Sequence, residues 1–245
     1  MRDLTMADRL RGAGLVVEEQ PGWQTRGSAL FAPRAVMWHH TASAMGRNLP
    51  SLNIVVNGRP DLPGPLCHVL TGRDNCNVVI AAGRANHAGN GSWNGSSVGN
   101  SAYWGVEVEN VGTVAEPWRP DQLQNVAEVT AALIGYDRTL VADCCMHKEW
   151  APTRKIDMHT ISGNEMRARV MQLCIGTPPT PPTPVHTYQK DQPMFMISEG
   201  LGLFLLVNGN VCQFATPQEF NKARESAPTI PTVVLPIPQA KALIG

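Results

Sequence analysis

The sequence lacks an excess of charge of either sign, and it lacks long apolar runs. Lysine plus arginine and aspartate plus glutamate number 20 each in 245 residues, so the formal net charge is zero. Because no cluster of basic residues offers the positive surface that nucleic-acid phosphates require, we expect no nucleic-acid partner. No stretch approaches the roughly 20 apolar residues of a membrane helix, so we also expect no membrane insertion.

Cysteine is scarce and irregularly spaced. The six cysteines form no Cys-x-x-Cys pair, which argues against a disulfide scaffold, and we expect most of them to be reduced core residues. Cys144 and Cys145 adjoin His147, so one of them could approach a site there. Adjacent residues of a strand face opposite sides, however, and burial is the favoured role for both.

The N-terminal segment lacks the apolar core of a secretion signal. Residues 1–10 carry two arginines and two aspartates where such a signal would be apolar. We therefore expect the protein to be made and folded in a cytoplasm. Reaching a substrate outside that compartment would require another factor.

Apolar periodicity predicts an α/β fold. The segment 35–40 reads as a buried strand, and residues 120–135 as an amphipathic helix that ends at Gly135. Residues 66–70 and 78–82 form a hairpin pattern around a turn rich in Gly, Asn and Asp. We expect a mixed central β-sheet flanked by helices. The other predicted elements are strands 15–19 and 140–142 and helices 5–14, 49–56 and 164–173.

Two further segments carry polar residues of interest. Residues 85–95 contain too much Gly and Asn for regular structure, and a long loop that holds His87 and Trp93 favours a binding role. Residues 104–110 alternate strictly, with Glu107 and Glu109 on one face. This alternation predicts a strand that is half-buried or lies at a sheet edge.

A Pro/Thr segment divides the chain. Residues 177–184 read Thr-Pro-Pro-Thr-Pro-Pro-Thr-Pro, a composition that favours an extended spacer of about 3 Å per residue. We expect a larger domain at residues 1–176, the linker at 177–184 and a small α+β module at 185–245. The elements predicted in that module are strands 194–197, 203–207 and 211–214 and a helix at 217–227.

One short stretch concentrates chemically active side chains. His147 and Asp157 lie within residues 147–157, close to the basic pair Arg154-Lys155, and both are potential zinc ligands. A catalytic zinc ion needs three such protein groups and an open fourth position. The best third donor is the His39-His40 pair at the end of strand 35–40. A single histidine is more often structural than a ligand, so it is the combination that favours a metal site.

These motifs together resemble a known family. His39-His-Thr-Ala after an apolar strand, Gly105-Val-Glu107-Val, and His147-(x7)-Lys155-x-Asp157 are similar to the zinc-dependent N-acetylmuramoyl-L-alanine amidases, also called amidase type 2. That family includes bacteriophage lysozymes and peptidoglycan recognition proteins. The resemblance extends from about Gly22 to Val170, and the ordered set of motifs is more specific than any one of them.

The resemblance implies a zinc site and its catalytic partners. His39, His147 and Asp157 would be the zinc ligands, with His39 chosen because the family uses the first histidine of its His-x-Thr/Ser pattern. Lys155 would stabilise the oxyanion and Glu107 would act as general base and then as acid. The competing interpretations are a solvated Lys155 beside Arg154 and a structural ion pair for Glu107.

The resemblance also implies substrate-binding residues and one departure. His87 matches a histidine of the family's substrate cleft, and His40 and Trp93 are further candidates for substrate binding. His68 is interpreted as a core residue or part of the cleft wall. Cys67 stands where one branch of the family has a catalytic tyrosine, which places more weight on Glu107.

The resemblance predicts a hydrolase of bacterial peptidoglycan. A water activated by zinc would cleave the amide bond between N-acetylmuramic acid and L-alanine. The alternative is a recognition module that binds muropeptides without cutting them, but the chain keeps all three candidate ligands, which favours the enzyme. The overall layout is typical of a bacteriophage endolysin, made in the host cytoplasm and acting on the cell wall after release to cause cytolysis. The 185–245 module would bind the cell wall or self-associate.

Overall fold

A computed structural model describes residues 1–176 and, beyond them, residues 194–198, 202–207, 210–214, 222–223, 226 and 232–234. The chain divides into two compact units, Met1–Pro182 and Thr183–Gly245. The linker predicted at 177–184 lies outside the described residues. In the described part of the chain, no helix is both long and apolar enough to cross a bilayer.

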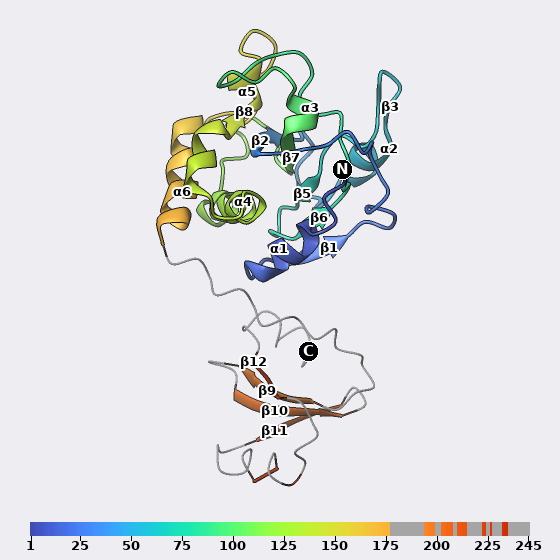
Figure 1. Ribbon diagram of the computed structural model, residues 1–245, viewed down its shortest axis with the longest axis vertical. Helices are drawn as coiled ribbons and strands as arrows, with labels where there is room; N and C mark the ends of the chain where they lie inside the picture. Colours follow the sequence, from blue (N-terminus) through green and yellow to red (C-terminus); the bar gives the residue numbers. More distant parts are fainter. Residues whose placement is uncertain are drawn as a thin grey trace. The chain divides into compact units, whose positions relative to one another are not determined.

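The first unit is built on a mixed six-stranded sheet with the order β1-β6-β5-β7-β2-β8 (Figure 1). Neighbouring strands run parallel except for β5 and β6, which form the predicted antiparallel hairpin. The predicted mixed α/β class is therefore confirmed. The strands are β1 (Val17–Glu19), β2 (Ala35–His40), β5 (Val69–Thr71), β6 (Asn77–Val79), β7 (Tyr103–Val108) and β8 (Cys145–Met146), and a separate two-stranded sheet pairs β3 (Gly58–Arg59) with β4 (Leu62–Pro63).

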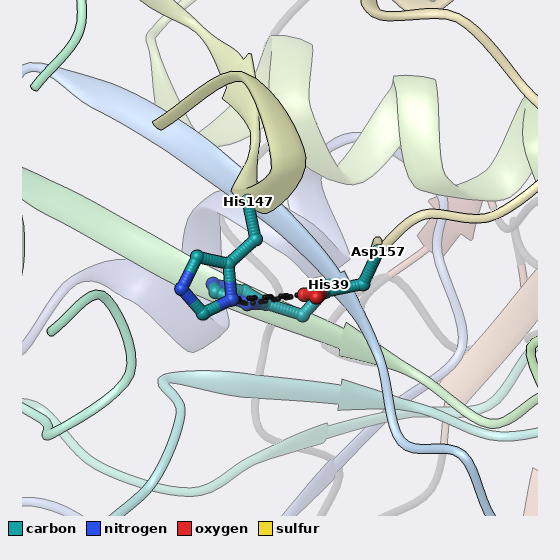
Figure 2. A group of neighbouring side chains, drawn as sticks. All are labelled: His39, His147 and Asp157. Atoms are coloured by element: carbon teal, nitrogen blue, oxygen red, sulfur yellow. Dashed lines mark hydrogen bonds and ion pairs between the residues drawn. The ribbon is translucent and has the colours of Figure 1, made fainter. Parts of the chain in front are cut away.

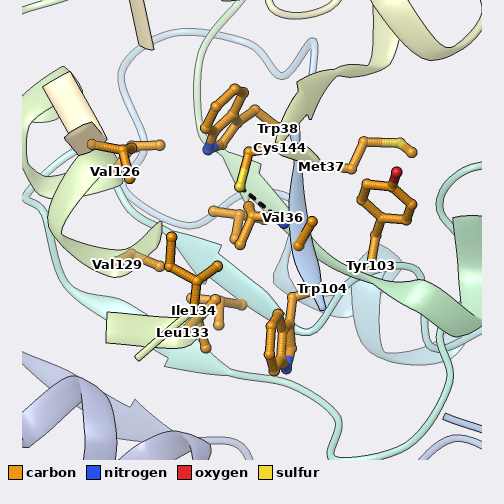
Figure 3. Packing of buried hydrophobic residues seen from close by; sticks show 14 of the residues in the cluster. Val36, Met37, Trp38, Tyr103, Trp104, Val126, Val129, Leu133, Ile134 and Cys144 are labelled. Atoms are coloured by element: carbon orange, nitrogen blue, oxygen red, sulfur yellow. Dashed lines mark hydrogen bonds between the residues drawn. The ribbon is translucent and has the colours of Figure 1, made fainter. Parts of the chain in front are cut away.

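Helices cover both faces of this sheet. The helix α4 (Pro120–Leu133) packs against α1 (Met6–Gly12), α6 (Gly163–Ile175) and the strands β2 and β7. Trp38 of β2, which belongs to the main core drawn in Figure 3, donates a hydrogen bond from its indole nitrogen to Thr130 Oγ1 of α4 at 2.8 Å. On the other face, Val55 of α2 (Leu52–Asn57) packs over Leu70 and Val78 of the hairpin. The sheet thus has a core on each side, as alternate strand residues require.

Two short helices complete the first unit and lie close to the strand ends. The helix α3 (Gly99–Ala102) leads directly into β7, and α5 (His147–Trp150) directly follows β8. Neither was predicted from the sequence. Cys67, Cys76, Cys144 and Cys145 are buried and free, which confirms the prediction of reduced core cysteines for these four. Cys144 Sγ accepts a hydrogen bond from the Val36 amide at 3.4 Å (Figure 3).

Two predictions about strands are wrong. Residues 140–142 belong to a 3₁₀ helix, η1 (Arg138–Asp143), which begins where the Asp137 carboxylate accepts the Thr139 amide at 2.8 Å. The strand at 104–110 is neither half-buried nor at an edge, because β7 lies between β5 and β2 in the centre of the sheet. Glu109, which alternation placed on the same face as Glu107, is completely buried.

The second unit contains a four-stranded sheet with the order β11-β10-β9-β12. Its strands β9 (Met194–Ser198), β10 (Gly202–Val207) and β11 (Asn210–Phe214) are the three that were predicted, and they pair antiparallel. The strand β12 (Thr232–Val234) was not predicted and runs parallel to β9. The predicted helix at 217–227 lies mostly outside the described residues.

Candidate metal centre

The strand ends of the first unit bring three predicted residues into one row. The register pairs His39 of β2 with Glu107 of β7, and it pairs Trp38 with Met146 of β8, the residue before His147. Glu107, His39 and His147 therefore lie side by side at the carboxyl ends of three neighbouring parallel strands. This edge is where open α/β sheets commonly place their ligand sites.

Asp157 completes a compact cluster with the two histidines. The distances are 2.9 Å between His39 Nδ1 and His147 Nδ1, 2.9 Å between His147 Nδ1 and Asp157 Oδ2, and 3.2 Å between His39 Nδ1 and Asp157 Oδ2. The three side chains point at one another from separate segments (Figure 2). Their residues are 1%, 2% and 8% exposed for His39, His147 and Asp157, so the cluster is almost fully enclosed.

The remaining ring nitrogens determine which tautomers the histidines adopt. His147 Nε2 lies 2.9 Å from the Ala88 carbonyl oxygen, which only accepts, so Nε2 must carry the hydrogen. His87 Nε2 lies 3.1 Å from the Tyr103 carbonyl oxygen, so His87 Nδ1 is left as an acceptor. His39 Nε2, at 3.1 Å from His87 Nδ1, is then the donor in that contact. Both His39 and His147 are therefore left with an unprotonated Nδ1.

This arrangement fits a divalent cation. Two bare Nδ1 atoms and a carboxylate oxygen, all acceptors, converge with no hydrogen between them, and a cation relieves the repulsion among such lone pairs. Burial, followed by the neighbouring His147, lowers the pKa of His39 to about 4, so His39 is neutral at pH 7. Zinc favours two histidines and a carboxylate, and ligand bonds of about 2.0–2.1 Å around a tetrahedral ion separate ligand atoms by about 3.3 Å. Among the described residues, this is the group suited to holding a metal ion.

Glu107 lies beside the cluster with an unusual protonation equilibrium. Its Oε2 is buried and has no hydrogen-bond partner within the described part of the chain. Burial first, and then the charge of Asp157, raises the pKa of Glu107 to about 8, while the Lys155 charge opposes the shift. A carboxyl group with a pKa near neutrality is suited to taking up and returning a proton.

Arg154 and Lys155, which are neighbours in the chain, have different surroundings in the structure. Arg154 donates to the carbonyl oxygens of Ala88 at 3.1 Å and Asn90 at 2.7 Å, and thus holds the loop beside the cluster. The Lys155 side chain is half-buried, and its charge lowers the pKa of both His39 and Glu107. Lys155 therefore lies near the cluster as a source of positive potential.

The three residues predicted to bind substrate have other partners in the structure. His87 is 8% exposed, and its Nδ1 lies 3.1 Å from His39 Nε2. His40 faces away from His39, and its Nδ1 accepts the His159 amide at 3.2 Å. Trp93 stacks under the Arg167 guanidinium, 5.0 Å from the ring centre, and donates its indole N–H to Ala142 O at 3.2 Å. Their roles in substrate binding stay predictions.

Sequence reasoning missed a buried carboxylate that organises the neighbouring loop. Glu109 accepts hydrogen bonds from Thr41 Oγ1 and from the Ser51 amide, each at 2.8 Å, and from the Ser43 hydroxyl. It thereby fixes residues 41–51, the segment that follows the end of β2 that carries His39. The only sequence signal was that Glu109 shares a face with Glu107, and its partners are too distant in the chain to be inferred.

Several solved structures are similar to this chain. No curated protein sequence matches the chain at a significant level. A selenomethionine derivative of AmpD is 23% identical over 64% of this chain and 94% of that chain, with a TM-score of 0.49. The amidase LysC from Clostridium intestinale is 18% identical over 63% of this chain and 96% of that chain, with a TM-score of 0.49. A mutant endolysin from Bacillus subtilis is 17% identical over 64% of this chain and 99% of that chain, with a TM-score of 0.48.

A family model described as N-acetylmuramoyl-L-alanine amidase, Amidase_2, matches residues 30–160. The matched residues make up more than half of the chain and include His39, His147 and Asp157. The protein therefore belongs to the N-acetylmuramoyl-L-alanine amidase family.

Proposed function

We propose that the protein is a zinc-dependent peptidoglycan hydrolase that cleaves the amide bond between N-acetylmuramic acid and L-alanine. The observation that carries the proposal is the convergence of His39 Nδ1, His147 Nδ1 and Asp157 Oδ2, with both histidines held in the tautomer that binds a metal. Membership of the amidase family supports the choice of substrate.

The residues around the cluster supply what amide hydrolysis needs. Bound zinc would act as a Lewis acid that lowers the pKa of water to about 7. The charge of a bound cation would favour the ionised form of Glu107. That carboxylate accepts the proton that the attacking water loses, and it later delivers a proton to the nitrogen of L-alanine as the C–N bond breaks. Lys155 stabilises the negative charge that develops on the carbonyl oxygen. The products are a free carboxylate on the lactyl group of the sugar and a free amino group on the peptide.

A muropeptide-binding module without catalysis is the alternative. Such a module has no use for a carboxyl group placed beside a complete set of candidate metal ligands. The position of Glu107, in register with His39 and beside the three candidate ligands, therefore favours the enzyme.

We further propose that the enzyme serves as a bacteriophage endolysin. The support is the layout of the chain, in which a family domain is followed by a Pro/Thr segment and a second compact unit. A second unit that binds the cell wall would raise the local concentration of the first at its insoluble substrate. Self-association is the other role that this layout allows for residues 185–245.

Mass spectrometry of purified peptidoglycan after digestion tests the reaction directly. The expected fragments are glycan strands with a free lactyl carboxylate and stem peptides with a free L-alanine amino terminus. The His147→Ala variant serves as the control that lacks the metal site, so it should release neither fragment. Fragments cut at a glycosidic bond, or at a peptide bond within the stem, would contradict the proposal.

A further inference from the structure

One short loop, residues 86–90, supplies the groups that contact the Nε2 atoms of both His39 and His147. The 86–90 loop places the His87 ring against His39 Nε2 and the Ala88 carbonyl oxygen against His147 Nε2. These two contacts determine which nitrogen of each ring carries a hydrogen, and so which nitrogen faces the metal position. Small displacements of this loop would therefore change both ligands at once.

Asn100 holds the two loop residues that make these contacts. Its side-chain oxygen, Oδ1, accepts the His87 amide at 2.9 Å and the Ala88 amide at 2.8 Å. Asn100 belongs to α3, which leads directly into β7, so the loop is tied to the centre of the sheet. A single side-chain atom thus fixes the backbone amides of both His87 and Ala88.

Two glycines allow the loop to approach this closely. A Cβ atom at Gly105 of β7 would lie 2.6 Å from His87 Cγ, so the His87 ring fits only against a bare backbone. A Cβ atom at Gly99 would lie 2.5 Å from the Ala88 Cβ. Both separations are shorter than van der Waals contact permits. The loop is therefore seated on α3 and β7 as well as hydrogen-bonded to them.

We propose that Asn100 is a positioning residue that, through the 86–90 loop, sets the orientation and tautomer of both His39 and His147. The inference rests on the proposed function insofar as the two histidines bind zinc. Asn100 itself does not contact the three ligand atoms of the cluster. Its action is exerted through the His87 ring and the Ala88 carbonyl oxygen.

Outer partners of this kind have a measurable effect on metal binding. Replacing a group that hydrogen-bonds a metal-binding histidine commonly weakens metal affinity by about 10–100-fold. Asn100→Ala removes the acceptor of two amide hydrogens and so loosens the loop at His87 and Ala88, while Arg154 still donates to the Ala88 and Asn90 carbonyl oxygens. We expect zinc affinity to fall by about 10–100-fold, with a similar fall for His87→Ala.

A conservative variant separates this role from general support of the fold. In Asn100→Asp a carboxylate oxygen takes the place of Oδ1 and accepts the same two amides, so we expect zinc affinity within about 3-fold of the original. Asn53→Ala, an exposed asparagine in helix α2, is the matched control and should leave affinity unchanged. Zinc affinity is measured on the full chain by competition with a chromogenic chelator.

A second readout does not depend on metal. Long-range proton–nitrogen NMR spectra of the metal-free full chain report the tautomer of each histidine. We expect His39 and His147 to carry the hydrogen on Nε2 in the unaltered protein and in Asn100→Asp. In Asn100→Ala, both tautomers should appear. If Asn100→Ala fails to fold, Asn100→Ser, whose hydroxyl can accept one of the two amides, is expected to show an intermediate loss.

The two readouts distinguish the possible failures. Absence of zinc binding by the unaltered protein would contradict the proposed function, and the tautomers would still decide the role of Asn100. Unchanged affinity and tautomers in Asn100→Ala would overturn the inference. Equal losses in Asn100→Ala and Asn100→Asp would overturn it as well, because the two accepted hydrogen bonds would then not be what matters.

Discussion

His39 and His40 are neighbours in the sequence, but only His39 faces His147 and Asp157. We expect the purified protein to hold about one zinc ion per chain, and His39→Ala, His147→Ala and Asp157→Ala each to lose it, since three-ligand sites depend on every ligand. His40→Ala is the matched control and should keep its zinc. Metal analysis of the four variants checks this, and a full zinc content in His147→Ala would contradict the site.

Glu107 stands beside His39 without being one of the three clustered candidate ligands. Glu107→Gln should therefore keep zinc but lower turnover by about 10²–10⁴-fold, the usual contribution of general acid–base catalysis. Metal content and the rate of muropeptide cleavage are measured together, with Glu18→Gln on the exposed strand β1 as the control. An unaffected rate would make Glu107 a structural residue.

The buried His68 side chain should make the stability of the metal-free protein depend on pH. Burial lowers the pKa of His68 from 6.5 to about 3, so the unfolded chain binds a proton between these values that the folded protein does not. The free energy of unfolding should therefore fall as the pH drops from 6.5 toward 3, by about 1.4 kcal/mol per unit of pKa difference.

Denaturant unfolding of the metal-free protein at a series of pH values measures this slope. His68→Asn keeps an acceptor for the Gly105 amide, which His68 Nδ1 accepts at 2.8 Å, but it does not titrate. The variant should show a shallower fall in stability between pH 6.5 and pH 4. An identical slope in both proteins would show that His68 is not a source of the acid sensitivity.

The loop at 41–51 depends on one buried carboxylate at the end of β7. Glu109→Gln places an amide hydrogen donor opposite the hydroxyl and amide donors of that loop, so an acceptor is lost and a buried donor is left unpaired. We expect a loss of about 1–3 kcal/mol in unfolding free energy. Hydrogen exchange across residues 41–51 should also speed up. Unchanged exchange there, beside the Glu18→Gln control, would show that the loop is held by other contacts.

At the level of elements, the sequence was most informative where apolar periodicity was long. The strand at 35–40 and the helix at 120–135 were predicted almost to the residue, since each has a clear pattern and a clear end. The strand predicted at 140–142 was wrong, because three apolar residues fit a strand and a turn of 3₁₀ helix equally well. The central position of β7 was missed because the loop that buries Glu109 lies more than fifty residues away in the chain.

The candidate site, too, could be predicted only where the sequence holds a clear pattern. The three clustered residues stand within short motifs that resemble a family, so they could be chosen before the fold was known. The groups that hold the Nε2 atoms of His39 and His147 could not be predicted. A backbone carbonyl at Ala88 and an asparagine in the short helix α3 leave no distinctive pattern, and their roles arise only when the 86–90 loop meets α3.

At the scale of the whole molecule, the two compact units give a test of the role of the second. The hydrophobic clusters described for the first unit lie entirely within residues 1–176. A chain ending at Gly176 should fold, bind zinc and cleave small soluble muropeptides as fast as the full chain, because a soluble substrate gains nothing from a tether.

On intact cell walls the shortened chain should be much slower than the full chain. The comparison of rates on soluble and insoluble substrate is the measurement, and light scattering on both chains accompanies it. Equal rates on walls would rule out anchoring by residues 185–245. A mass above that of a monomer for the full chain alone would then favour self-association.

The three clustered atoms of the candidate metal centre come from residues far apart in the chain, since Asp157 lies 118 positions after His39 but only ten after His147. An ion bound by all three would act as a removable cross-link. It would close the chain between His39 and Asp157, which is most of the first unit, into a loop. Cross-linking a chain over such a length restricts the unfolded state strongly. Zinc removal should then shorten the lifetime of the folded enzyme as well as stop its chemistry, so that resistance to proteases would report metal occupancy.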